Sequence, residues 1–169
     1  MQLHKGQQKV LDDKSSRKLV IVGARWGKST LAIEMALRRC QEKKRTIRLY
    51  EHNRQMVQWC MHYAYEYMER KSQKFTHDSR GRITFPNGSE LFIDTYPIFG
   101  DEELIFDDAF DRASAIAIMF TPWGWTKHQA PSTENPLVNV DEYRKSYDPE
   151  YFNSMFKGLF PWEDENESL

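Results

Sequence analysis

The sequence has few cysteines, no long apolar run and almost no net charge. Its two cysteines, Cys40 and Cys60, fall on apolar faces of expected helices, which predicts reduced core residues and no disulfide. No apolar run approaches the roughly 20 residues of a membrane span, and the first residues lack a signal-peptide pattern. A net charge of −1 gives no global basic field, so any contact with nucleic acid must come from a local patch or from assembly. We therefore expect a cytoplasmic protein without a membrane partner.

The five histidines show no metal-ligand spacing, and the chain contains no internal repeat or low-complexity linker. With 169 residues, 40% of them hydrophobic, the chain is long enough to bury a core. We expect a main domain over residues 1–130 and a C-terminal extension over residues 131–169 that ends in an acidic tail.

The clearest motif is a strand, a glycine-containing loop and a helix in immediate succession. The apolar strand Lys18–Val22 leads into Gly23, and Gly27-Lys28-Ser29 opens an amphipathic helix. This order is what a phosphate-binding loop requires, because backbone N–H groups and the helix N-terminus can converge on phosphate oxygens. Lys28 would reach the β- and γ-phosphates and Ser29 would bind Mg²⁺. The expected nucleotide-binding residues of this loop are Gly23, Ala24, Arg25, Trp26, Gly27, Lys28, Ser29 and Thr30.

The spacing of this loop departs from the standard pattern, which has four residues between its glycines. Here only the segment from Ala24 to Trp26 separates the two. Arg25 lies inside the loop, where an arginine can face the γ-phosphate from within its own subunit. An arginine turned to solvent is the alternative interpretation.

A short helix is expected over Leu3–Asp13, before the loop. Its Gln7 could read the adenine edge, because one side-chain amide can donate and accept hydrogen bonds at once. A solvated helix glutamine is the alternative interpretation.

The next segments predict an α/β arrangement. Helical periodicity covers Lys28–Lys43 and Arg54–Lys71, and a strand pattern covers Thr46–Tyr50 between them. Asn87-Gly88 lies between two alternating apolar runs, which predicts an antiparallel hairpin over Arg82–Thr95. A group of cations lies at the C-terminal end of the first long helix, and the helix dipole explains their position better than a DNA-binding patch does. The cations are Arg38, Arg39, Lys43, Lys44 and Arg45.

Paired carboxylates follow the apolar run Leu104–Phe106. Asp107 would hold Mg²⁺ through water, and Asp108 would polarise the attacking water. Asp94, which also follows apolar residues, is a rival for the metal, and acids that merely end a strand are a further alternative. A buried strand is expected at 115–120, and Thr121 at its end could sense the γ-phosphate.

The order of these motifs resembles the ATPase domain of viral large terminases, the motors that package DNA into procapsids. The resemblance runs from about residue 3 to residue 124. Its motifs are the Leu3–Gln7 segment, similar to the adenine-recognition motif; the variant phosphate loop; the Asn-Gly-Ser hairpin; the Leu104–Asp108 acidic motif; and Thr121-Pro122-Trp123-Gly124, similar to the coupling motif.

The resemblance implies Mg²⁺-dependent ATP hydrolysis that drives double-stranded DNA translocation in host cytoplasm. It also implies a homo-oligomeric ring on a capsid portal, with a separate nuclease or small terminase subunit as a further partner. The implied fold is an α/β P-loop domain with a mostly parallel sheet, helices on both faces and an antiparallel hairpin.

Three features depart from the family pattern. Asp108 stands where the family normally has glutamate, only a short segment separates the acidic strand from the 115–120 strand, and too few residues follow Gly124 for a nuclease domain. Two alternatives therefore stay open. One is a small P-loop nucleoside or nucleotide kinase, and the other is a degenerate nucleotide-binding regulator of a packaging motor.

Overall fold

The structure is a computed structural model that describes residues 3–15, 18–23, 25–51, 53–78, 81–95, 103–106 and 126–156. It divides into two compact units. Unit 1 combines Met1–Lys28 with Phe110–Leu169, and unit 2 is Ser29–Ala109. Four predicted site residues lie outside the described residues, as does the strand expected at 115–120; they are Ala24, Asp107, Asp108 and Thr121.

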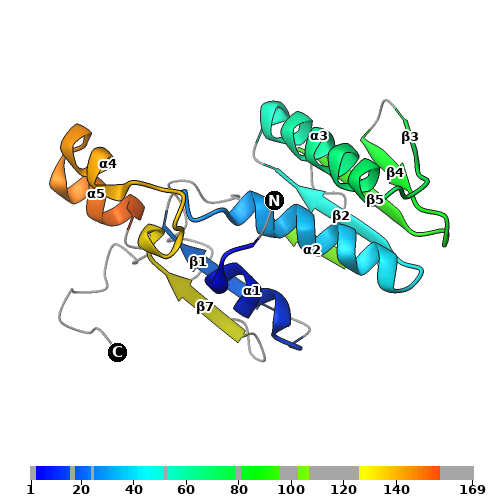
Figure 1. The fold of residues 1–169 in the computed structure, drawn as a ribbon, viewed down its shortest axis with the longest axis horizontal. Helices are drawn as coiled ribbons and strands as arrows, with labels where there is room; N and C mark the ends of the chain where they lie inside the picture. The colour runs from blue at the N-terminus through cyan, green and yellow to red at the C-terminus, as the bar shows by residue number, and fades with distance from the viewer. Residues whose placement is uncertain are drawn as a thin grey trace. The chain divides into compact units, whose positions relative to one another are not determined.

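Unit 1 is built around two parallel strands (Figure 1). β1 pairs with β7 over its whole length, so that Val22 lies beside Ala130. The strand predicted at 18–22 is confirmed as β1, whereas β7 was not expected from the sequence. The elements of this unit are α1 (Lys5–Asp12), β1 (Lys18–Val22), β7 (Thr126–Ala130), the 3₁₀ turn η1 (Ser132–Glu134), α4 (Val140–Ser146) and α5 (Pro149–Phe156).

Unit 2 contains a five-stranded sheet in the order β3-β4-β5-β2-β6. β2 is parallel to β5 and β6, whereas the β3–β4 and β4–β5 pairs are antiparallel. The expectation of a mostly parallel sheet is therefore only partly met. The elements are α2 (Lys28–Glu42), β2 (Thr46–Tyr50), α3 (Arg54–Arg70), β3 (Thr76–His77), β4 (Arg82–Thr84), β5 (Glu90–Asp94) and β6 (Glu103–Phe106).

The predicted hairpin is present, and its second strand belongs to the main sheet. Ile83 pairs with Leu91 across the hairpin, and Leu91 in turn lies beside Ile47 of β2. Gly88 closes the turn at φ +79°, a conformation that glycine adopts without strain. The hairpin is thus the continuation of the sheet beyond β5. β6 pairs with β2, so the strand that precedes the paired carboxylates is separate from the hairpin.

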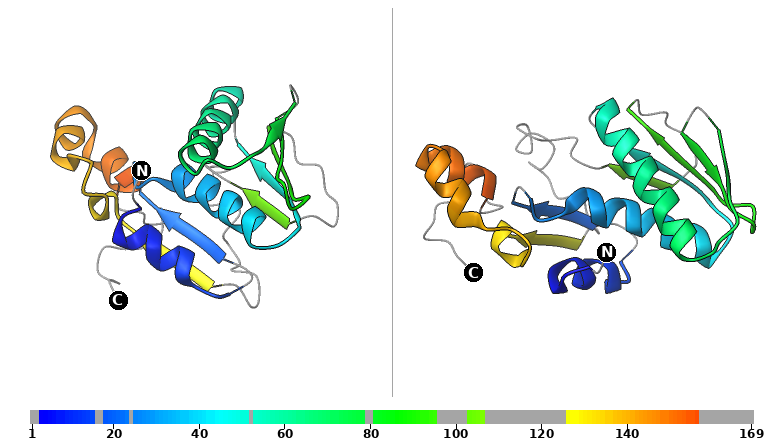
Figure 2. Two further views of the ribbon diagram at one scale, coloured as in Figure 1. Left: turned by 45° about the vertical axis from the view of Figure 1, so that its right-hand side comes forward. Right: turned by 45° about the horizontal axis from the view of Figure 1, so that its top comes forward.

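Both long helices cover the same face of this sheet (Figures 1 and 2). The alternating strand residues Ile47, Leu49 and Leu91 join one buried cluster with Leu37 of α2 and Met68 of α3. In the described part of unit 2, the expected arrangement with a helix on each face is therefore not seen. The cluster also holds both cysteines, which are buried and reduced as predicted.

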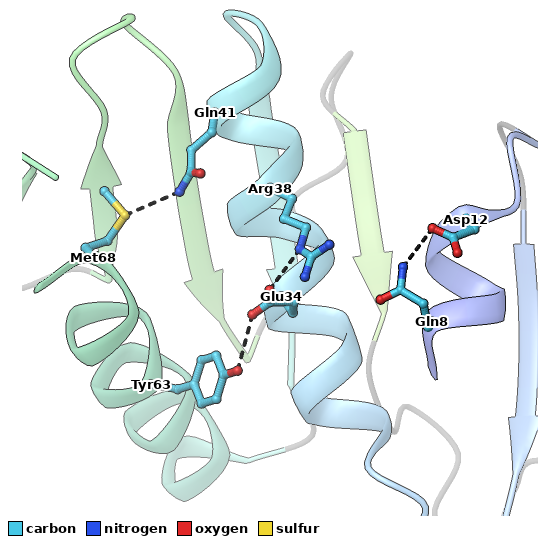
Figure 3. Close-up of polar contacts among 7 residues, drawn as sticks. All are labelled: Gln8, Asp12, Glu34, Arg38, Gln41, Tyr63 and Met68. Atoms are coloured by element: carbon cyan, nitrogen blue, oxygen red, sulfur yellow. Dashed lines mark hydrogen bonds and ion pairs between the residues drawn. The ribbon is translucent and has the colours of Figure 1, made fainter. Parts of the chain in front are cut away.

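A buried carboxylate joins the two helices across their contact (Figure 3). Glu34 of α2 accepts a hydrogen bond from the Tyr63 hydroxyl at 3.2 Å and one from Nε of Arg38 at 2.8 Å. Burial, and then the nearby Glu34 charge, raises the pKa of Tyr63 to about 12, so its hydroxyl stays a donor at neutral pH. Tyr63 therefore belongs to the buried face of α3.

Candidate phosphate-binding site

The candidate loop runs from the end of β1 to the start of α2. The Gly23 N–H donates to the Ala130 carbonyl at 3.0 Å, which extends the β1–β7 pairing by one residue. The Trp26 N–H donates to the Gly23 carbonyl at 3.2 Å and closes a turn. These two N–H groups are engaged within the protein, so a bound phosphate would rely on the other N–H groups of the loop and of the first turn of α2.

Two residues of the loop have left-handed backbone conformations. Arg25 has φ 64° and Gly27 has φ 100°. A side chain at position 27 would also collide with Gln7, because an added Cβ would lie 2.5 Å from the amide nitrogen. Arg25 carries a strain of about 1 kcal/mol or more for a conformation that favours glycine, so other contacts must hold it there.

Helix α1 holds the loop through a reciprocal capping box. The Nδ1 atom of His4 accepts hydrogen bonds from the N–H groups of Gly6 at 3.2 Å and Gln7 at 3.4 Å. The Gln7 Oε1 atom accepts from the His4 N–H at 3.0 Å. Because Nδ1 acts as an acceptor, the ring proton of the neutral His4 lies on Nε2, which donates to the Trp26 carbonyl at 2.9 Å.

Three consecutive loop carbonyls are bonded to side chains from elsewhere in unit 1. The Arg25 carbonyl accepts from the Asn135 amide at 2.7 Å. The Trp26 carbonyl is held by His4, and the Gly27 carbonyl accepts from Nε2 of Gln7 at 2.9 Å. In a planar trans peptide the N–H points opposite to the C=O. The N–H groups of Gly27 and Lys28 are therefore turned away from α1, as an anion site requires.

The Trp26 side chain anchors the middle of the loop. It is 1% exposed, and its indole N–H donates to Oε2 of Glu134 at 3.1 Å. The His4 ring packs against it edge-on, with 4.7 Å between the ring centroids. Trp26 was expected among the nucleotide-binding residues, and here its side chain fills the space between α1 and η1.

The carboxyl ends of β2 and β5 carry two further acids, both in unit 2. Glu51 follows β2, is 2% exposed and accepts a hydrogen bond from the Cys60 thiol at 2.9 Å. Its N–H donates to the Asp94 carbonyl at 3.0 Å. The exposed Asp94 carboxylate accepts from the Thr95 N–H at 2.6 Å. Among the described residues, no group of three or more His, Cys, Asp or Glu side chains could hold a metal ion.

No protein-family model matches this sequence, and no curated protein is significantly similar to it. Solved structures of the large terminase from a thermophilic bacteriophage do resemble it. One crystal form has a TM-score of 0.59 at 10% identity and covers 99% of this chain and 58% of that chain. The same terminase in complex with ADP has a TM-score of 0.53 at 12% identity, covering 89% of this chain and 52% of that chain.

This chain has a terminase-like fold. It spans little more than half the length of the terminase chains that it resembles. At this level of identity, the likeness concerns the arrangement of helices and strands. The candidate loop of this terminase-like fold lies between β1 and α2, where the sequence motif placed it.

The expected nucleotide-binding residues have different environments within this fold. Arg25 is exposed, and the first turn of α2 carries Lys28, Ser29 and Thr30, all half-buried. Gln7 is 4% exposed, so it is not the solvated helix residue of the alternative interpretation. Both ends of its amide bond to the protein, and adenine recognition by Gln7 stays a prediction.

Sequence reasoning missed the side chains that hold the loop from η1. Glu134 and Asn135 lie more than 100 residues from their partners, and no local pattern indicates such contacts. His4 also escaped sequence reasoning, because the helix-start signal is Ser, Thr, Asp or Asn followed three positions later by Glu or Gln, and histidine is not one of these capping residues. Within the described residues, no helix is long and apolar enough to cross a membrane.

Proposed function

We propose that the chain is a Mg²⁺-dependent ATPase of a viral DNA-packaging motor, similar to the ATPase part of a large terminase. The observation that carries the proposal is the terminase-like fold over 99% of the chain, with the restrained glycine loop between β1 and α2. The structure of the phage terminase in complex with ADP further supports a nucleotide as the ligand.

The residues at the start of α2 fit a phosphate group. The first turn of α2 contains no acidic side chain, and Lys28 adds a cation to the partial positive charge of the helix N-terminus. The Ser29 hydroxyl has the hard oxygen that Mg²⁺ prefers. In this proposal Asp107 completes the metal site, Asp108 orients the attacking water and Thr121 senses the γ-phosphate.

The positions of Arg25 and Gln7 suggest two further roles. Arg25 is exposed on the loop, where its guanidinium can stabilise charge that develops on the γ-phosphate. Gln7 bonds to the Gly27 carbonyl, so its first role is to orient the loop. An adenine ring that bonded to the Gln7 amide would compete with the bond between Gln7 and the Gly27 carbonyl. Recognition of the base would thereby be coupled to the conformation of the loop.

The motor activity requires partners. We propose double-stranded DNA as the substrate of translocation and a homo-oligomeric ring on a capsid portal as the working assembly. A separate nuclease or small terminase subunit would complete the packaging apparatus.

The decisive experiment replaces Lys28 with alanine and measures ATP binding by calorimetry and ATP hydrolysis with and without duplex DNA. Lys28→Ala should weaken ATP binding and abolish hydrolysis, because the phosphate charge loses its cation. Lys9→Ala, which removes an exposed lysine of α1, is the matched control and should change neither. Unchanged ATP binding in a folded Lys28→Ala variant contradicts the proposal.

The same preparation distinguishes the two alternative functions. Phosphoryl transfer to nucleosides in a coupled assay would support the kinase. Tight ATP binding without turnover, in the presence and absence of DNA, would support the regulator.

A further inference from the structure

Unit 2 has a groove at the end of the sheet where its parallel strands begin. The groove has a volume of about 220 Å³ and lies between the end of α2, the segment after α3 and the β4–β5 turn. We call it the amide groove, because three carboxamides line it together with one lysine and two apolar residues; the lining residues are Gln41, Gln73, Lys74, Phe85, Pro86 and Asn87.

Two of the segments that line the amide groove, the end of α2 and the residues after α3, are rich in exposed cations. The described segments that end α2 and α3 contain five exposed cations and only one exposed acid without an ion pair, Glu69. The cations are Lys43, Lys44, Arg70, Lys71 and Lys74. The other acid, Glu42, lies 3.9 Å from Arg45, and Glu90 at the start of β5 lies 3.5 Å from Arg82. This end of unit 2 is therefore strongly basic, although the whole chain has a net charge of −1.

Helix dipoles do not account for this charge. The two helix ends supply about half a negative charge each, which is far less than the excess of cations. One carbonyl in the last turn of α2 also has other partners. The Cys40 carbonyl accepts from Asn87 at 2.8 Å and from the Ser89 hydroxyl at 2.7 Å. Lys43 and Lys44 are therefore not needed to cap this carbonyl, and the helix dipole as the reason for these two cations stays a prediction.

The groove has the chemistry that binds a sugar–phosphate backbone. Lysine, asparagine and glutamine are among the side chains that contact phosphate and sugar in protein–DNA complexes. Gln41 donates only to the weakly accepting sulfur of Met68 among the described residues (Figure 3), at 3.7 Å. Phe85 is only 4% exposed, so the groove offers no ring on which an unpaired base could stack. These features favour a duplex over a single strand.

The groove is separate from the candidate phosphate loop. α2 begins at Lys28 and has 15 residues, so its two ends are about 22 Å apart. Lys44, beyond the far end of α2, lies over the β4–β5 turn, with Cε 3.4 Å from an ideal Cβ position at Gly88.

We propose that the amide groove and its five cations bind the backbone of double-stranded DNA without reading its sequence. The choice of DNA as the polyanion rests on the proposed function, whereas the charge and the groove do not. In this arrangement the two ends of α2 serve two ligands, with nucleotide at Lys28 and DNA beside Gln41.

The test measures binding of the whole chain to a fluorescent DNA duplex by anisotropy over a series of salt concentrations. The double variant Lys44→Gln/Lys74→Gln should weaken binding by roughly tenfold per lysine near 0.1 M salt and lower the salt slope by about 1 per lysine. The control Lys9→Gln/Lys145→Gln removes the same charge from exposed lysines of unit 1 and should change neither quantity.

Gln41→Ala tests the groove itself. It should weaken duplex binding while the salt slope stays the same, because the amide carries no charge. A single strand of the same sequence should bind more weakly than the duplex.

Equal losses of DNA affinity in the two double-lysine variants would show an effect of net charge alone and would overturn the proposal. Equal affinities for duplex and single-stranded DNA would also overturn it. The ATPase assay separates this failure from failure of the proposed function. Lys44→Gln/Lys74→Gln should keep ATP turnover in the absence of DNA, and Lys28→Ala should keep DNA binding.

Discussion

Replacement of Gln7 by alanine tests how the phosphate loop is held in shape. The change removes two hydrogen bonds, one from the His4 N–H and one to the Gly27 carbonyl. At about 1 kcal/mol for each bond, the loss of stability is about 2 kcal/mol. For a chain of this size, that corresponds to a decrease in melting temperature of roughly 4–8 °C.

The neighbouring glutamine of the same helix provides a matched control. The half-buried side chain of Gln8 bonds only to Asp12 among the described residues, at 2.7 Å (Figure 3). Gln8→Ala should therefore cost no more than about 0.5 kcal/mol, as is usual for a pair four residues apart on a helix surface. The comparison isolates the two contacts of Gln7, because both variants remove the same side chain from α1.

Nucleotide binding by the Gln7→Ala variant separates orientation of the loop from recognition of the base. If Gln7 acts through the Gly27 carbonyl, affinities for ATP and GTP should fall by the same factor, since both nucleotides have the same phosphates. Calorimetric titration with each nucleotide measures the ratio. A selective loss of ATP binding would instead support adenine recognition by Gln7. A melting temperature equal to that of Gln8→Ala would refute the reasoning about the two bonds.

Three further predictions concern catalysis and pH. Arg25→Ala should reduce turnover by about a thousandfold or more and leave ADP affinity nearly unchanged, because ADP lacks the γ-phosphate; equal loss of ADP and ATP binding in calorimetry would contradict this role. Asp108→Glu should raise turnover and Asp108→Asn should abolish it, since glutamate is one methylene longer and can reach a more distant water; steady-state hydrolysis decides, and slower hydrolysis by the glutamate variant would show a site built around aspartate. Asp13 accepts from the Ser15 N–H and from His128 at 2.7 Å, which lowers its pKa from 3.8 to about 2. Its ionised form therefore stabilises the fold above about pH 4 and loses this effect as the pH falls to 2, so the difference in melting temperature between the wild type and Asp13→Asn should shrink across that range; a difference that persists below pH 2 would argue against the ionised carboxylate as its source.

Strong local patterns made much of the fold predictable from the sequence. β2 occupies the predicted residues Thr46–Tyr50, because its alternation of apolar and polar residues matches a sheet with one buried face. The Asn87-Gly88 pair located the hairpin for an equally local reason, since few residues other than glycine adopt the backbone conformation of the turn.

The sequence did not predict features of the fold that depend on contacts between residues far apart in the chain. β7 reads Thr-Lys-His-Gln-Ala and has no apolar alternation, so its strand conformation comes from parallel pairing with β1 and not from its own residues. The arrangement of α2 and α3 on one face is likewise a property of the assembled core of unit 2. Helical periodicity shows which side of a helix is buried, and it does not show which face of the sheet that side meets.

The unusual spacing of the phosphate loop has a physical explanation in these long-range contacts. A loop with three residues between its glycines has little backbone freedom, and here Arg25 occupies a conformation that favours glycine. Bonds to the carbonyls of residues 25, 26 and 27 offset that strain, and they come from Asn135, His4 and Gln7. The loop shape is thus fixed by α1 and the segment after β7, rather than by glycine content. Because Asn135 lies 110 residues from Arg25, a motif search around Lys28 could not reveal this restraint.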